Sequence, residues 1–105
     1  MNTMIVYKVE ISNTANADRH ELMVFLRAVM SREGAHRYAS AMHDEILSLA
    51  IYADCFGESR SQTIRNVHPH ARRMVSHNRK WVYVFHLEED TVVVDRILNA
   101  KMITR

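Results

Sequence analysis

The chain has 105 residues, of which 48% are apolar and 25% are charged, and its formal net charge is only +2. These values predict one soluble globular domain, residues 1–105, and no membrane-spanning helix is expected, because no run approaches ~18 consecutive apolar residues. The opening residues lack the basic region and cleavage site of a signal peptide, and the single Cys55 cannot form an internal disulfide, so we expect a protein of the reducing cytoplasm.

The first part of the chain predicts a strand and then a helix. Residues 4–11 alternate between apolar and polar positions, as is typical of a strand. Ser12, Asn13 and Thr14 then offer oxygens for a helix cap, and apolar residues recur at helical spacing from about residue 15. Asp18 is expected in the first turn of this helix, where a carboxylate suits the positive helix end.

A second helix is expected after a break at residues 31–34, which contains Gly34. Its apolar positions run from residue 35 to about residue 50 and include Tyr38, whereas Glu45 is among the residues expected to face mostly water. Two helices with so short a joint predict an antiparallel αα-hairpin.

The middle of the chain has a weaker pattern. Residues 53–62 predict a loop, residues 63–67 are too few to assign, and Pro69 favours a turn because proline disfavours helix at the residue before it. Residues 72–77 predict a strand, which a turn at Asn78 and Arg79 joins to the next strand.

Residues 81–98 predict the central hairpin of the sheet. Two runs rich in β-branched and aromatic residues flank the acidic turn Glu88-Glu89-Asp90. Both faces of the first run are mainly apolar, so we expect central strands with one face covered by the helices. The element order predicts an α+β fold, β-α-α-β-β-β, with an antiparallel αα-hairpin on one face of a small, mainly antiparallel sheet.

Positive charge is concentrated between Ser59 and Leu87, where no acidic residue occurs. This asymmetry indicates an anionic partner or, equally well, an ordinary solvated basic face. Arginines on neighbouring strands could hold a phosphodiester or an acidic peptide, whereas the alternative is surface charge that protects an edge strand from aggregation. The candidate target-binding residues are Arg72, Arg73, Arg79 and Lys80 around one turn, Arg96 on a strand beside it, and Lys101 in the tail.

The sequence contains no recognisable catalytic or cofactor motif. Its seven histidines are not accompanied by a cysteine pair, its two glycines do not form a phosphate-binding loop, and Cys55 has no motif around it. We therefore expect no cofactor, no structural metal and no catalytic residue.

Two segments resemble the RelE/ParE superfamily of bacterial toxins. The first is the opening YKVEIS with the following helical hairpin that begins at Ala17-Asp18, and the second is the ending VYVFHLEEDTVVVDRILNAKM, with its RIL signature. The resemblance implies the β-α-α-β-β-β fold and the toxin half of a type II toxin–antitoxin pair. RelE-like members cut messenger RNA in the ribosome, whereas ParE-like members inhibit DNA gyrase.

The residues at the family's functional positions favour the ParE-like branch. Val82 stands where many relatives carry arginine, Asn99 stands where nucleases often carry histidine, and the tail after it has no Tyr or His. His77 and His86 remain alternative nuclease candidates. The resemblance implies a gyrase inhibitor rather than an enzyme; the alternatives are a ribosome-dependent endonuclease and a degenerate toxin that acts as an antitoxin-binding or operator module.

The resemblance also implies the partners. These are a cognate antitoxin and DNA gyrase, with operator DNA reached only through the antitoxin complex and no contact with membranes. Apolar residues in excess of one helical stripe, such as Met23 and Leu47, are expected to receive an amphipathic antitoxin helix, and the sheet edge could accept an added strand.

Overall fold

The four strands form one sheet, as the computed structural model of the chain describes it for residues 5–103. The strands are β1 (Lys8–Ile11), β2 (Arg72–Val75), β3 (Trp81–Glu88) and β4 (Thr91–Asn99). Their order is β1-β4-β3-β2, with β1 parallel to β4 and the other neighbours antiparallel. The expected α+β fold with a mainly antiparallel sheet is confirmed.

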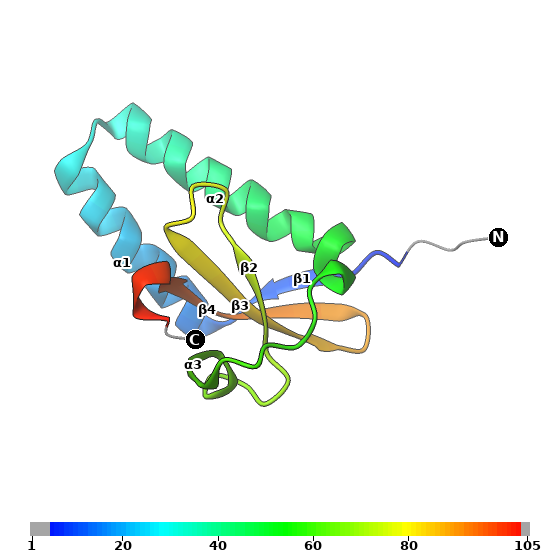
Figure 1. The fold of residues 1–105 in the computed structure, drawn as a ribbon. Coiled ribbons are helices and arrows are strands. Elements are labelled where there is room, and N and C mark those ends of the chain that lie inside the picture. The colour runs from blue at the N-terminus through cyan, green and yellow to red at the C-terminus, as the bar shows by residue number, and fades with distance from the viewer. Residues whose placement is uncertain (1–4, 104–105) are drawn as a thin grey trace.

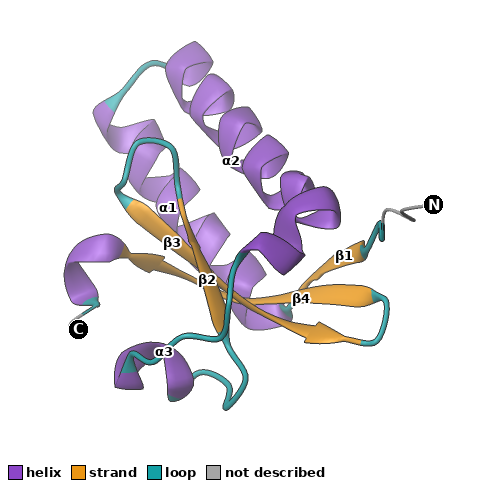
Figure 2. Ribbon diagram, turned by 45° about the vertical axis from the view of Figure 1, so that its right-hand side comes forward, coloured by secondary structure: helices purple, strands orange, loops and turns teal. Residues whose placement is uncertain are grey.

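Two long helices form the predicted αα-hairpin and cover one face of the sheet (Figures 1 and 2). They are α1 (Asn13–Val29) and α2 (Arg32–Tyr52), and a short 3₁₀ turn, η1 (Ala53–Cys55), follows α2. Their inward side chains pack with Tyr83 and Phe85 of β3 and with Val92 and Val94 of β4, all four of which are fully buried. The alternation expected along residues 81–87 therefore places the larger aromatic residues under the helices.

Serine caps set the starts of both helices. The Ser12 Oγ accepts a hydrogen bond of 3.0 Å from the amide of Ala15, and the Ser31 Oγ accepts one of 3.0 Å from the amide of Gly34. Both helices thus begin earlier than their apolar patterns, because the cap rather than the first apolar residue fixes the start. The prediction that Gly34 belongs to a break was wrong, since it lies in the first turn of α2. Asp18 lies beyond the first turn of α1, which contains no acidic residue.

The strand boundaries differ from the sequence prediction at several ends. The first strand covers only Lys8–Ile11, and residue 4 of the predicted strand lies outside the described residues. β2 ends at Val75, two residues earlier than expected. The tail begins with a 3₁₀ turn, η2 (Ala100–Met102), whereas residues 104–105 lie outside the described part.

The second face of the sheet is also covered, which the sequence did not predict. Residues 62–65, part of a stretch left as loop or unassigned, form the single helical turn α3 (Gln62–Arg65), which lies on the side opposite α1 and α2 (Figure 2). A small second core forms there from Ile64, Ala71, Val82, Val84 and Leu98. β3 is therefore buried from both sides.

One extra residue interrupts the pairing of β3 with β4. Val84 pairs with Arg96 and Phe85 pairs with Val94, so Asp95 has no partner on β3 and forms a β-bulge. The bulge changes which face each later residue of β4 occupies. Ile97 faces the helices as Val94 does, and Leu98 joins the second core.

Ile64 tests whether α3 contributes to the core. Its side chain is fully buried in the second core, so Ile64→Ala should lower the free energy of unfolding by about 2–5 kcal/mol, measured by urea denaturation. The control Leu47→Ala removes a side chain that is 47% exposed and should change it by less than about 0.5 kcal/mol. Equal stability of both variants would show that α3 does not cover the sheet.

Candidate target-binding surface

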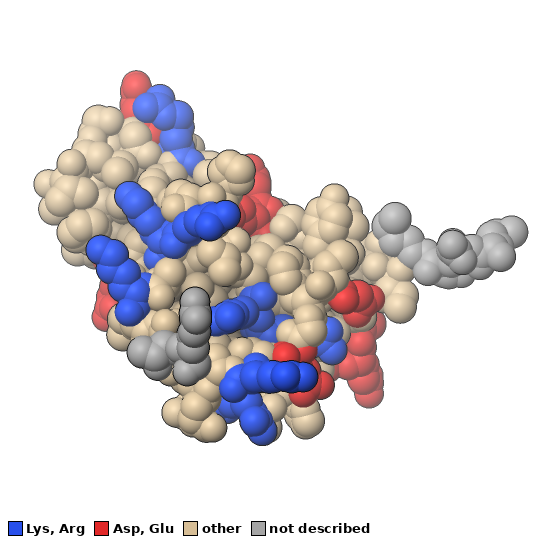
Figure 3. Space-filling model, in the orientation of Figure 1, with Lys and Arg blue, Asp and Glu red and all other residues tan. Residues whose placement is uncertain are grey.

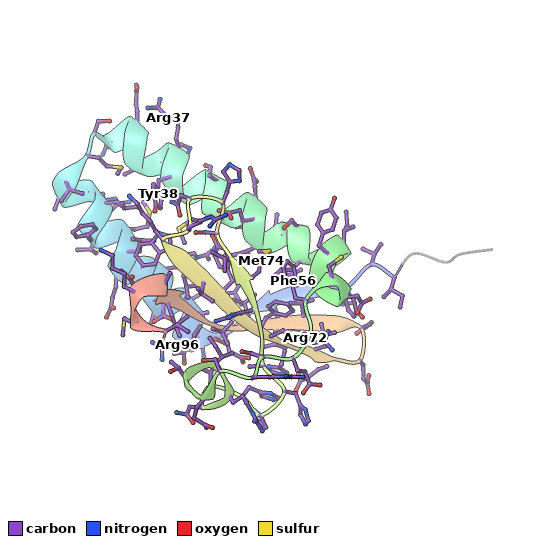
Figure 4. The ribbon with its side chains drawn as sticks, viewed as in Figure 1. Arg37, Tyr38, Phe56, Arg72, Met74 and Arg96 are labelled. Atoms are coloured by element: carbon purple, nitrogen blue, oxygen red, sulfur yellow. The ribbon has the colours of Figure 1, made fainter. Side chains whose placement is uncertain are left out.

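Arg72 is bound within the fold rather than free on the surface. It is half-buried at the start of β2, and its Nη1 donates a hydrogen bond of 2.7 Å to the backbone carbonyl of Phe56 (Figure 4). Arg72 thereby fastens the loop after α2 to the sheet. Its neighbour Arg73 is exposed and lines a shallow hollow with residues 55–61.

Arg96 is also held by contacts within the fold, in this case with the carboxylate of Asp18. Its Nε donates to the Asp18 Oδ2 at 2.8 Å and its Nη2 to the Oδ1 at 3.1 Å, while the same Oδ2 accepts the amide of Ile97 at 2.9 Å. This hydrogen-bonded carboxylate raises the pKa of Arg96. Asp18 thus occupies the edge of β4 beyond the end of β1. Arg96 lies on β4, the strand next to β3 of the hairpin, and β3 separates it from Arg72 and Arg73 on β2.

The remaining predicted cations lie at the opposite end of β2 from Arg72 and Arg73. Arg79 and Lys80 are exposed in the β2–β3 turn, and Lys101 is exposed in η2. The amide of Ala100 donates to the carbonyl of Lys80 at 2.9 Å, so the two turns lie side by side. We call Arg79, Lys80 and Lys101 the basic tip.

The basic tip is free to meet a partner. Among the residues that the structure describes, none of its three side chains makes an ion pair or a side-chain hydrogen bond. Figure 3 shows Lys and Arg side chains over the β2–β3 turn. An exposed cluster of unpaired cations attracts anionic groups and steers them toward it.

Hydrogen bonds within the turn fix the backbone that carries Arg79 and Lys80. The Asn78 Oδ1 accepts from the Ser76 hydroxyl at 2.7 Å and from the Lys80 amide at 2.9 Å. The Arg79 amide donates to the Ser76 carbonyl at 2.9 Å. The turn expected at Asn78 and Arg79 is therefore present and well ordered by its own polar groups.

Helix α2 holds the same turn from the side. The Tyr38 hydroxyl accepts hydrogen bonds from the Trp81 Nε1 at 2.5 Å and the Asn78 Nδ2 at 2.9 Å. The Glu45 carboxylate accepts the His77 amide at 2.7 Å and the Tyr83 hydroxyl at 3.2 Å. Burial and then the nearby Glu45 raise the pKa of Tyr83, which therefore remains a donor.

These contacts could not be found from helical spacing. The sequence placed Tyr38 on an apolar face and Glu45 in water, yet both side chains are half-buried and bonded to the turn. The only available signal was the polar atom that each side chain would have to satisfy once buried.

The alternative nuclease candidates are differently placed. His86 is only 6% exposed, with its Nδ1 2.6 Å from the Asp95 Oδ2 and its Nε2 3.5 Å from the Glu88 Oε1. The ring of His68 stacks flat on it, with centroids 3.8 Å apart and planes 2° apart. His77 is exposed on the turn, where its backbone amide is bound by Glu45. The structure therefore does not bring His77 and His86 together in one polar network.

The loop over His86 is held by a second histidine. The His70 amide donates to the His68 Nδ1 at 3.0 Å, and the His70 Nδ1 lies 3.0 Å from the Glu58 Oε1. The hydrogen bond to His70 is the main reason that the pKa of Glu58 is lowered. The turn predicted at residues 68–70 thus fastens the loop to the sheet. Within residues 5–103, no group of three or more His, Cys, Asp or Glu side chains is arranged to hold a metal ion.

Comparison with known proteins identifies a structural relative. No protein-family model matches the sequence, and no curated protein matches it. A solved chain described as "Chromosomal ParDE TA system from P. aeruginosa" is similar in structure, with a TM-score of 0.75 at 14% identity, over 90% of this chain and 96% of that chain. At this identity the similarity demonstrates the fold, which is the one that the sequence resemblance implied. None of the described helices is long and apolar enough to cross a membrane.

The contacts of Asp18 predict that it stabilises the fold. Asp18→Ala leaves the Ile97 amide and the Arg96 guanidinium without their acceptor, and should lower the free energy of unfolding by about 1–3 kcal/mol. Urea denaturation measures this loss. Asp44→Ala, at an exposed carboxylate on α2, is the control and should change stability by less than about 0.5 kcal/mol. A loss no larger than that of the control would contradict a structural role for the pair.

The Glu58–His70 contact predicts a dependence on pH. Because the pKa of Glu58 is lowered in the folded protein, the contact stabilises the fold above the pKa of the unfolded chain and is lost as the pH falls through the folded value. His70→Ala should raise the pKa of Glu58 toward its usual value, as seen by NMR titration of the side-chain carboxyl. An unchanged titration would show that His70 is not the cause.

Proposed function

We propose that this chain is the toxin of a type II toxin–antitoxin module and that it acts, as a ParE-like protein in the cytoplasm, by binding and inhibiting DNA gyrase. The fold it shares with a chain of a ParDE system supports the toxin assignment. The motifs at its two ends, which resemble the same superfamily, agree with that assignment.

The observation that carries a binding mechanism is the basic tip. Three exposed cations without ion-pair partners in the described part stand on adjoining turns whose backbones are hydrogen-bonded. A charged hydrogen bond to a target is worth more than an ordinary surface charge, roughly 1.5–3 kcal/mol against less than about 0.5 kcal/mol. The three cations of the tip are therefore the groups that we expect to contribute most to binding of an anionic target surface.

A ribosome-dependent endonuclease is the second candidate, and the described geometry gives it less support. Such an enzyme needs an accessible acid or base beside the scissile phosphate. His86 is buried with carboxylates near both ring nitrogens, and Asn99 uses its Oδ1 to accept the Lys101 amide at 2.9 Å. A degenerate toxin that keeps only antitoxin and operator functions is the third candidate.

The outer side of the αα-hairpin is the proposed antitoxin surface. A hollow near the α1–α2 connection has an apolar floor and a basic rim, formed by Met23, Arg27, Arg32, Glu33, Ala35, His36 and Arg37. Leu47 on α2 is also exposed. An amphipathic antitoxin helix with acidic residues beside its apolar stripe suits this surface. Operator DNA would then be bound through the antitoxin.

A supercoiling assay tests the proposal. Purified protein should inhibit DNA supercoiling by gyrase, because the basic tip binds the enzyme, and the antitoxin encoded beside it should restore activity. In cells, expression without antitoxin should induce the DNA-damage response before translation falls.

Two results would contradict this function. Cleavage of ribosome-bound message by the purified protein would support the endonuclease instead. Absence of growth arrest on expression, with the antitoxin still bound in titrations, would support the degenerate module.

A further inference from the structure

We infer that Arg79 is the anchor for the target and that Tyr38 and Glu45 of α2 are positioning residues that act through its turn. The inference rests on the proposed function and adds to it the residues that carry binding. It starts from the backbone of Arg79.

Arg79 has a backbone conformation that its side chain disfavours. Its φ is +64°, in the left-handed region where glycine and asparagine are tolerated best and other residues are uncommon. Among the described residues, the other non-glycine residue with positive φ is Glu89, in the two-residue β3–β4 turn that commonly requires it. The residue with positive φ in the β2–β3 turn is an arginine, although glycine or asparagine would suit this backbone conformation better.

The fold does not use the side chain that it places there. Arg79 is exposed, and its guanidinium has no hydrogen-bonding or ionic partner within the described residues. Strained backbone positions persist where the surrounding structure enforces them, and they cluster at functional sites. The guanidinium therefore serves a contact outside this chain, and its planar donors suit an anionic group of the target.

Helix α2 adds support from outside the turn to the hydrogen bonds within it. Tyr38 bonds to Asn78 and Trp81, which flank Arg79 and Lys80, and Figure 4 shows Tyr38 beside this end of the sheet. Glu45 binds the amide of His77 at the other side of the turn. Neither side chain belongs to the exposed tip. Together they pre-order the turn, which reduces the entropy lost when Arg79 binds.

Arg79→Gly separates binding from stability. Glycine relieves the positive φ, so the melting temperature should stay the same or rise, whereas the concentration that half-inhibits gyrase supercoiling should rise roughly tenfold or more. Arg79→Lys keeps the charge and should retain part of the inhibition. The matched control Arg65→Ala removes an exposed arginine of α3 and should inhibit as the wild type does.

A double-mutant cycle tests the positioning role. Tyr38→Phe removes the shared hydroxyl, so it should speed amide exchange at residues 76–81 and weaken inhibition without changing antitoxin affinity. In the Arg79→Gly background it should weaken inhibition no further, because Tyr38 acts through Arg79. Glu45→Gln should follow the same pattern. Additive effects of Tyr38→Phe and Arg79→Gly would overturn the positioning role.

The outcomes separate this inference from the proposed function. Full inhibition by Arg79→Gly, with an active wild type, overturns the anchor and leaves the gyrase proposal standing. If the wild type arrests growth without inhibiting gyrase, gyrase is not the target. Loss of growth arrest in Arg79→Gly then supports Arg79 as the anchor, and unchanged growth arrest overturns it. A wild type that does neither overturns both.

Discussion

The extra residue in β4 is the feature on which the rest of the fold depends. Strict alternation from Val94 would place Arg96 under the helices, where its charge would have no water. The bulge at Asp95 instead turns Ile97 toward the helices and leaves Arg96 where it reaches Asp18. Asp95 itself joins β4 to its surroundings, since its side chain contacts His86 and its carbonyl accepts the Ser12 hydroxyl at 3.0 Å. The one unpaired residue, Asp95, thus lets β4 direct apolar side chains to the helices on one face of the sheet and to the second core on the other.

The arginines of this protein perform two different tasks. Arg72 and Arg96 connect segments that are distant in sequence, and each does so through a bond to an oxygen inside the fold. The side chains of Arg79, Lys80 and Lys101 make no such bond within the described part and remain available. The net charge does not reveal this difference. An arginine that is bonded inside the fold and one that is free to bind a partner each add the same +1. The distinction lies in where the nearest acceptor is.

Most of the fold could be predicted from the sequence, and the contacts of the candidate site could not. Helical spacing and strand alternation are local signals, so both helices and the central hairpin were predictable. α3 was missed because four residues give no periodic pattern. Asp18 and Arg96 are 78 positions apart and Tyr38 and Trp81 are 43 apart, so no local pattern could pair them. The bulge at Asp95 could not be predicted either, because it is defined by the register between β4 and its partner strand β3.

The place of β4 in the chain has a consequence for synthesis. β4 lies between β1 and β3 in the sheet, yet it follows every other strand along the described sequence. A nascent chain emerges from the ribosome with its N-terminal part first. β1 therefore has no strand to pair with until residues 91–94 have been synthesised, which happens after α1 and α2 have emerged. Translation that stops before residue 91 leaves only the β2–β3 pair, so incomplete products lack the sheet on which the helices pack.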